Sequence, residues 1–82
     1  MSKPAFLTVD RTVFIIKHKD GYVSDTAKGT FKVTETREEA KRYISWQAVL
    51  KMAQECGAEE IQEVDADNCN TVTRRYEVRR AT

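Results

Sequence analysis

Four apolar residues in a row near the start of the chain predict a β-strand that is apolar on both of its faces. They belong to residues 11–19, a segment rich in the β-branched and aromatic side chains that are typical of strands. Side chains alternate along a strand, so Phe14 and Ile16 point to one face of the sheet and Val13 and Ile15 to the other. A single helix can cover only one of these faces. The second face must therefore be covered by something else.

Three covers for the second face follow from the sequence. The N-terminal arm, residues 1–10, contains Phe6, Leu7 and Val9 and could fold back over the sheet. A second copy of the chain, giving a homodimer, or a different partner protein could also bury this face, because exposed apolar patches mark interaction surfaces. In the last two cases Val13 and Ile15 belong to a protein interface.

An Asp-Gly pair, Asp20-Gly21, follows the first strand and is a strong signal for a β-hairpin, because glycine adopts a positive φ at little cost. Tyr22-Val23-Ser24 is then the returning strand. Residues 25–29 are polar and predict a turn, and Thr30-Phe31-Lys32-Val33 predicts a third short strand. The first part of the chain is therefore expected to form a β-meander.

Two signals for the start of a helix lie in the middle of the chain. Thr36 and Glu39 have the spacing of a capping box, which predicts that a helix begins near Thr36. At about 100° per residue, however, the apolar side chains before and after Ile44 lie on nearly opposite sides of one continuous helix. We therefore expect a break near Ile44, a second helix that begins at the N-cap Ser45, and an end at Gly57 as its C′ residue.

The last third of the chain predicts a second hairpin. Residues 58–64 indicate a weak acidic strand, residues 65–70 a turn, and residues 71–80 an alternating strand that is half covered by the core. The expected fold is a small α+β domain, built from a β-meander, one main helix and a C-terminal β-hairpin. A chain of 82 residues suffices for one such domain, so we expect residues 1–82 to form a single unit with residues 1–10 as an arm.

Charge is balanced over the whole chain but unevenly distributed along it. Fourteen basic and thirteen acidic side chains give a net charge of +1, which excludes a strongly basic protein that coats nucleic acid. Residues 1–34 carry a net charge of +3, residues 35–68 of −5 and residues 69–82 of +3. If the first and last strands are close in space, a basic surface of the sheet opposes an acidic surface of helix and loops.

The acidic and the basic groups each suggest a binding surface. The acidic set could imitate nucleic-acid phosphates and occupy a groove on another protein; as a protein interface it comprises Glu38, Glu59, Glu60, Glu63, Asp65 and Asp67. The basic set could contact phosphates as a nucleic-acid-binding site; it comprises Arg74, Arg75, Arg79, Arg80, Lys17 and Lys19. For both sets the alternative is a solvated surface whose arginines pair with the acidic centre.

The residues that catalysis or metal binding requires do not form a recognisable set. The single histidine, His18, is flanked by two lysines near the tip of a hairpin. Cys56 and Cys69 lack the spacing of a zinc or redox motif, and we expect both to be reduced thiols. Asp65-Ala66-Asp67-Asn68 has the pattern that starts a calcium loop, but the glycine and glutamate needed at the sixth and twelfth positions are missing. We therefore expect no catalytic residues, no cofactor and no bound metal.

The segment from Ile16 to Ser24, followed by Ala40-Lys41-Arg42-Tyr43-x-Ser45-x-x-Ala48, resembles a pattern in small uncharacterised phage and prophage proteins. In these proteins a hairpin with a Gly-Tyr turn precedes an Ala-Lys-Arg-aromatic segment, which looks like a short strand before a capped helix. The resemblance covers residues 13–64 and implies an accessory protein that binds a host component. Small phage proteins without catalytic groups often act as stoichiometric inhibitors, including inhibitors of CRISPR and other host defences. The resemblance implies no individual functional residue.

These observations predict a small phage-type binding protein that is not an enzyme and that inhibits or redirects a host macromolecule. The N-terminal residues do not have the pattern of a secretory signal, and no apolar run is long enough to span a membrane. We therefore expect a cytoplasmic location, no membrane contact, and a host protein or protein–nucleic-acid complex as the partner. One alternative is a nucleic-acid-binding module that uses the C-terminal arginine strand. Another is an assembly subunit that forms a large homo-oligomer.

Overall fold

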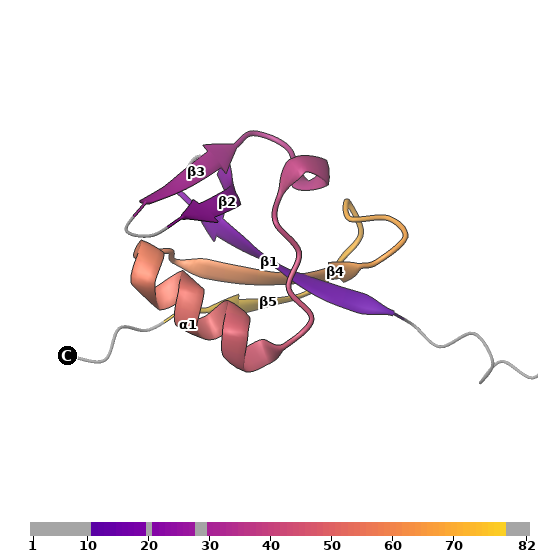
Figure 1. The fold of residues 1–82 in the computed structure, drawn as a ribbon. Coiled ribbons are helices and arrows are strands. Elements are labelled where there is room, and N and C mark those ends of the chain that lie inside the picture. Colours follow the sequence, from indigo (N-terminus) through magenta and orange to yellow (C-terminus); the bar gives the residue numbers. More distant parts are fainter. Residues whose placement is uncertain (1–10, 20, 28–29, 79–82) are drawn as a thin grey trace, which may run out of the picture.

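The chain forms a five-stranded antiparallel sheet and one α-helix, which confirms the predicted α+β class (Figure 1). The computed structural model describes residues 11–19, 21–27 and 30–78, so the predictions for the N-terminal arm and for Arg79 and Arg80 lie outside the described residues. The strands are β1 (Thr12–His18), β2 (Gly21–Ala27), β3 (Thr30–Thr34), β4 (Glu60–Asp65) and β5 (Val72–Glu77). A short 3-10 helix, η2 (Arg37–Glu39), and the α-helix α1 (Trp46–Cys56) stand between β3 and β4. The strand order across the sheet is β3-β2-β1-β4-β5.

Strand β1 is the centre of the sheet, but it pairs unequally with its two neighbours. It pairs with β4 along six residues, from Thr12 opposite Asp65 to Lys17 opposite Glu60. Its register with β2 extends only over Lys17 opposite Tyr22 and His18 opposite Gly21. Strands β1 and β2 therefore diverge beyond the hairpin, and the first half of β1 has an open edge on the β2 side.

Residues 40–43, which we call the strap, occupy this opening between β1 and β2. The backbone N–H of Lys41 donates to the carbonyl of Val23 on β2 at 2.9 Å. Tyr43 exchanges two backbone hydrogen bonds of 2.8 Å with Phe14 on β1, which makes an isolated antiparallel bridge. Figure 1 shows the strap crossing β1 on its way from η2 to α1. The segment is thus extended, held by backbone bonds on both sides, and followed by the capped helix.

Both caps predicted for the main helix are confirmed. The Ser45 hydroxyl accepts a hydrogen bond from the backbone N–H of Ala48 at 3.3 Å, which satisfies one of the free donors at the helix start. At the other end Gly57 has a left-handed φ of 71°, and its N–H bonds the carbonyls of Ala53 and Gln54. The phase break near Ile44 therefore marks the start of α1.

The prediction of a helix beginning at Thr36 is wrong, because the chain makes only the 3-10 turn η2 there. The Thr36 hydroxyl caps no backbone N–H; it donates to the Glu39 carboxylate at 3.1 Å, and the Thr34 hydroxyl donates to the same carboxylate at 2.8 Å. Thr36 and Glu39 therefore bond to each other through their side chains, and neither forms the side chain to backbone bonds of a capping box. The expected turn at residues 25–29 also starts too early, because β2 continues to Ala27 past a bulge between Val23 and Asp25.

Replacing Ser45 with alanine is expected to lower the free energy of unfolding by about 1 kcal/mol, because the N–H of Ala48 loses its acceptor. Urea denaturation followed by circular dichroism measures this loss. Thr36→Ala is the matched control and should change the free energy by less than about 0.5 kcal/mol, since its hydroxyl caps no backbone group. Equal losses in the two variants would contradict this assignment of the caps.

The sheet has an apolar core on each of its faces. On the α1 face, Ile16, Val23, Val49, Ala53 and Ile61 are buried together. On the opposite face the buried cluster comprises Ile15, Ala40, Val64 and Cys69, with Val13, Tyr22 and Val72 packed against it.

Described residues of the same chain pack on the second face, so burial of Ile15 requires neither a second copy nor a partner protein, while the N-terminal arm proposed as a cover lies outside the described residues. Ala40, at the start of the strap, and Cys69, in the loop between β4 and β5, pack on Ile15, which is 0 % exposed. Beside them the Arg37 Nε donates to Oε1 of the buried Gln62 at 3.0 Å, and the Arg37 guanidinium lies over the Tyr22 ring at 5.3 Å. Ile15 is therefore a core residue of the folded chain, and Val13 lies half-buried at the margin of the same cluster.

Candidate binding surface

The six acidic residues proposed as an interface are distributed over different parts of the sheet. Glu38 on η2 and the loop that carries Asp67 meet at one end of the sheet, where Asn70 Nδ2 donates to the Glu38 carboxylate at 3.3 Å. Asp65 stands at the start of that loop, and its carboxylate accepts the backbone N–H of Asp67 at 2.8 Å. The remaining three glutamates lie elsewhere on β4 or beside it, so the structure does not unite the acidic set in one surface.

Glu59 and Glu60 lie at the far end of β4 and line a pocket of about 550 Å³ with three basic residues of the nucleic-acid set, Lys17, Lys19 and Arg75. Glu77 lines the same pocket, and the Arg75 Nε is 3.8 Å from the Glu60 carboxylate. The three cations that the fold brings together are thus accompanied by three carboxylates. Such a balance does not give the positive potential that phosphate binding requires.

The two described arginines of the C-terminal strand, Arg74 and Arg75, point to opposite faces of the sheet. Arg75 is opposite Gln62 in the register, and Arg74 is opposite Glu63. Arg75 joins the pocket described above, whereas Arg74 lines a different pocket on the α1 face. The described part of the arginine strand therefore offers one cation to each face.

The Glu63 side chain lies on the α1 face of the sheet, apart from Glu59 and Glu60 and in the lining of a pocket that it shares with Asp65. Its two carboxylate oxygens accept hydrogen bonds from the Tyr76 hydroxyl at 2.9 Å and from the Thr12 hydroxyl at 2.8 Å. An open pocket of about 520 Å³ surrounds it, which we call the Glu63 pocket; it is lined by Thr12, Phe14, Glu63, Asp65, Arg74 and Tyr76, among others.

Three aromatic side chains form a cluster next to this pocket. The sequence alone did not predict that they meet. The Trp46 ring is 4.8 Å from the Tyr76 ring and 5.5 Å from the Phe14 ring, and the rings are inclined by about 60° to each other. Trp46 is nevertheless 38 % exposed. The alternating pattern around Tyr76 and the apolar face of α1 were visible in the sequence, but their contact depends on the strand order.

The most exposed large apolar residue of the described structure is Ile44, which is 86 % exposed. It precedes the N-cap Ser45, the position from which an apolar side chain often packs on the fourth helical residue as a hydrophobic staple. That residue is Val49, which is 0 % exposed and belongs to the buried cluster, while Ile44 is not part of it. Ile44 therefore does not form a hydrophobic staple with Val49.

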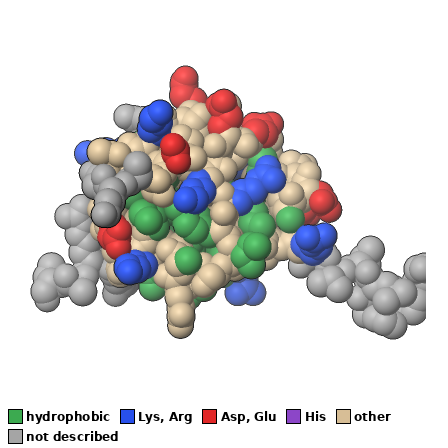
Figure 2. All heavy atoms as spheres, in the orientation of Figure 1, with side chains coloured by type: hydrophobic (Ala, Val, Ile, Leu, Met, Phe, Trp, Pro, Cys, Tyr) green, Lys and Arg blue, Asp and Glu red, His purple; other side chains and the backbone are tan. Residues whose placement is uncertain are grey.

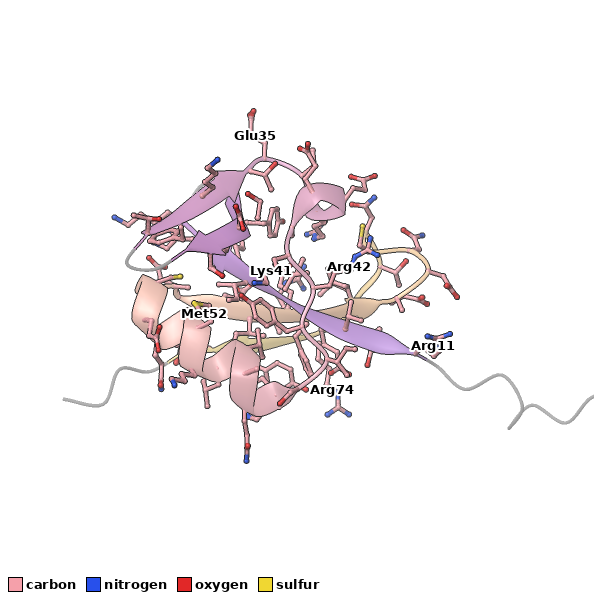
Figure 3. All side chains as sticks on the ribbon, in the orientation of Figure 1. Arg11, Glu35, Lys41, Arg42, Met52 and Arg74 are labelled. Carbon is pink, nitrogen blue, oxygen red and sulfur yellow. The ribbon has the colours of Figure 1, made fainter. Side chains whose placement is uncertain are left out.

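Ile44 and Trp46 follow two basic residues of the strap in the chain, and a third basic residue lies near the start of α1; we call the residues Lys41, Arg42, Ile44, Trp46 and Arg74 the strap surface. Figure 3 shows Lys41 and Arg42 on the strap and Arg74 near the start of α1. In Figure 2 hydrophobic side chains are visible at the centre of this face, with Lys and Arg side chains among them and several acidic ones along the upper edge.

The two arginines of the strap surface have no carboxylate within ion-pair distance among the described residues. Lys41 contacts only uncharged groups in these two interactions: its Nζ donates to the Thr26 hydroxyl at 3.1 Å and lies 5.5 Å from the centre of the Tyr43 ring. The positive charge of this surface is therefore not compensated by its own neighbours.

The pKa values of two titratable groups, the buried Tyr43 of the strap and the half-buried Cys56 at the end of α1, are raised. Burial raises the pKa of the Tyr43 hydroxyl, and burial followed by the nearby Glu55 charge raises the pKa of the Cys56 thiol. Both cysteines are free thiols, and among the described residues no three histidine, cysteine or acidic side chains form a group suited to a metal ion. The expectation that the chain is not an enzyme stays a prediction.

No helix within the described ranges is long and apolar enough to cross a membrane. Comparison with known proteins gives no family model that matches the sequence and no significant match among characterised proteins or solved structures.

Proposed function

We propose that the chain is a non-catalytic binding protein that docks through the strap surface onto an acidic patch of a partner protein. The observation that carries this proposal is the exposure of Ile44 beside the half-exposed Trp46, at a point where backbone bonds of the strap and the Ser45 cap fix the chain. An isolated exposed apolar residue is ordinary, but an exposed isoleucine and a partly exposed tryptophan two residues apart in the chain are side chains of the kind that mark an interface. Tryptophan and arginine are also the residue types that contribute most to binding energy in interfaces.

The charges around this patch favour an acidic partner. Arg42 and Arg74 flank it without carboxylate partners of their own among the described residues, so carboxylates of a docking protein would meet cations already in place. Complementary charges of this kind accelerate association and exclude wrong partners. The mixed pocket beside Arg75 offers nucleic acid no comparable excess of positive charge.

The consequence of docking that we propose is inhibition or redirection of a host macromolecule by occlusion of its surface. This part of the proposal is supported by the resemblance to small phage proteins and by the absence of a recognisable catalytic set in the sequence. Inhibition by occlusion requires that one chain binds one partner molecule.

Replacing Ile44 with aspartate is expected to weaken partner binding about thirtyfold or more, because it removes the apolar anchor and places a negative charge opposite an acidic surface. In the experiment, the tagged chain is used to capture its partner from nuclease-treated bacterial lysate. Titration calorimetry with the purified partner then measures the affinity and the stoichiometry. Stability should stay within about 0.5 kcal/mol of the wild type, since the side chain is exposed.

Val33→Asp is the matched control, because Val33 is 47 % exposed but lies on β3, outside the strap surface. The control should retain the affinity of the wild type, and Arg42→Glu should lose it. Binding that Ile44→Asp leaves intact, or retention that disappears with nuclease, would overturn the proposal; the second result would indicate nucleic acid as the ligand.

A further inference from the structure

The Glu63 pocket opens on the α1 face of the sheet, directly beside the strap surface. Tyr76 and Phe14 line it and also contact the Trp46 ring, so the pocket and the exposed tryptophan share two side chains. Its volume of about 520 Å³ exceeds what one amino-acid side chain needs. A protein docked on the strap surface would therefore cover its mouth.

Among the described residues, the charge of Glu63 has no ion-pair partner in this pocket. The two hydrogen bonds that hold the carboxylate come from the neutral hydroxyls of Thr12 and Tyr76. These bonds orient the carboxylate but leave its negative charge uncompensated. A carboxylate oxygen has two acceptor sites, so each oxygen of Glu63 can accept one further donor.

Arg74 is the nearest candidate for a cationic partner, and it does not pair with Glu63. The two residues are opposite each other in the register of β4 and β5, yet their side chains make no ion pair. The Glu63 carboxylate is bonded on one side to Thr12 of β1 and on the other to Tyr76, which lies two residues after Arg74 on the same face. The pocket thus presents an oriented anion and a separate free cation side by side.

The walls of the pocket suit a flat cation. The rings of Phe14 and Tyr76 provide aromatic surface, which attracts a guanidinium group by cation–π interaction. Asp65 adds a second carboxylate to the lining. A guanidinium also forms two parallel hydrogen bonds with one carboxylate, a geometry that an ammonium group does not match.

We propose that the Glu63 pocket binds an arginine side chain presented by the partner protein. The guanidinium lies against Tyr76 and pairs with Glu63, while Arg74 at the same pocket meets an acidic residue of the partner. This proposal rests on the proposed function for the identity of the partner, but the pocket itself can be tested without one. The partner is then acidic as a whole and carries an arginine at the position that faces Glu63.

Titration of the full chain with N-acetyl-arginine-methylamide tests the pocket. The chain has a single tryptophan, so the fluorescence of Trp46 reports binding next to Tyr76, and the backbone amide shifts of Thr12, Glu63 and Tyr76 locate it. We expect a saturable change in both signals. Glu63→Gln should weaken the binding about tenfold or more, because a hydrogen bond between charged groups is lost. Glu60→Gln, in the other pocket, is the matched control and should not change it.

The uncharged analogue N-acetyl-citrulline-methylamide has the same shape as the probe and should not bind, which keeps the test decisive even if Glu63→Gln does not fold. Shifts that rise linearly without saturation, that are the same for the citrulline analogue, or that centre on the Glu60 pocket would overturn the proposal. Arg74→Ala separates it from the proposed function. This change should strengthen probe binding about two- to fivefold by removing a nearby like charge, but it should weaken docking of the acidic partner.

Discussion

Replacing Gly21 with alanine is expected to lower the free energy of unfolding by about 3 kcal/mol, because the first residue of β2 has no room for a side chain. A Cβ atom at this position would collide with the backbone carbonyl oxygen of Thr34 and lie 2.6 Å from Cγ1 of Val33. Gly21 is buried between β1 and β3, so the clash cannot be relieved by moving into solvent. For a domain of this size the melting temperature should fall by roughly 10–20 °C.

The double variant Gly21→Ala with Val33→Ala is the informative control. It removes the contact with the flexible Cγ1 atom but leaves the collision with the Thr34 backbone, so it should recover only part of the lost stability. Thermal unfolding followed by circular dichroism measures the wild type and both variants. Full recovery, or a Gly21→Ala variant as stable as the wild type, would show that the β2–β3 pairing can shift at little cost.

Replacing Ile15 with alanine is expected to lower the free energy of unfolding by about 3 kcal/mol, since it leaves a cavity in the smaller core of the sheet. Ile15 is 0 % exposed, and the residues that bury it, Ala40 and Cys69 among them, belong to the same chain. The loss should therefore be the same at protein concentrations that differ tenfold, as measured by urea denaturation.

Concentration dependence is what distinguishes this packing from an interface between copies. If a second chain covered Ile15, the wild type would become more stable at higher concentration and the variant would lose that dependence. Val33→Ala serves as the comparison on an exposed apolar position and should cost much less than Ile15→Ala. A wild-type midpoint that rises with concentration would contradict the self-covered core.

The parts of the fold that the sequence predicted correctly depend on neighbouring residues. Ser45 and Gly57 mark the ends of α1 through contacts within one helical turn, and both were identified from local pattern. The hairpin at Gly21 was also correct, but for a different reason than expected. Of the turn residues that the structure describes, Lys19 has a positive φ, with a value of 44°, whereas Gly21 is needed for space.

The parts that the sequence did not predict depend on contacts between distant segments. The cover of Ile15 follows from the divergence of β1 and β2, which lets the strap pass between them. The alternation of side chains in β4 places Glu63 on the α1 face and Glu60 on the other, so a set that is continuous in sequence is divided in space. Nor could the helical phase show that Ile44 would be left outside the core.

The strap makes the candidate binding surface depend on the tertiary structure of the sheet. Its hydrogen bonds reach Val23 on β2 and Phe14 on β1, so the strap can take its path only when both strands are in place. A peptide of residues 40–56 carries Ile44, Trp46 and the Ser45 cap but lacks the partners on the sheet, including the Phe14 and Tyr76 rings. Recognition by this surface would thus be restricted to chains that have completed their tertiary structure, and a partner would discriminate them from nascent or partly unfolded copies.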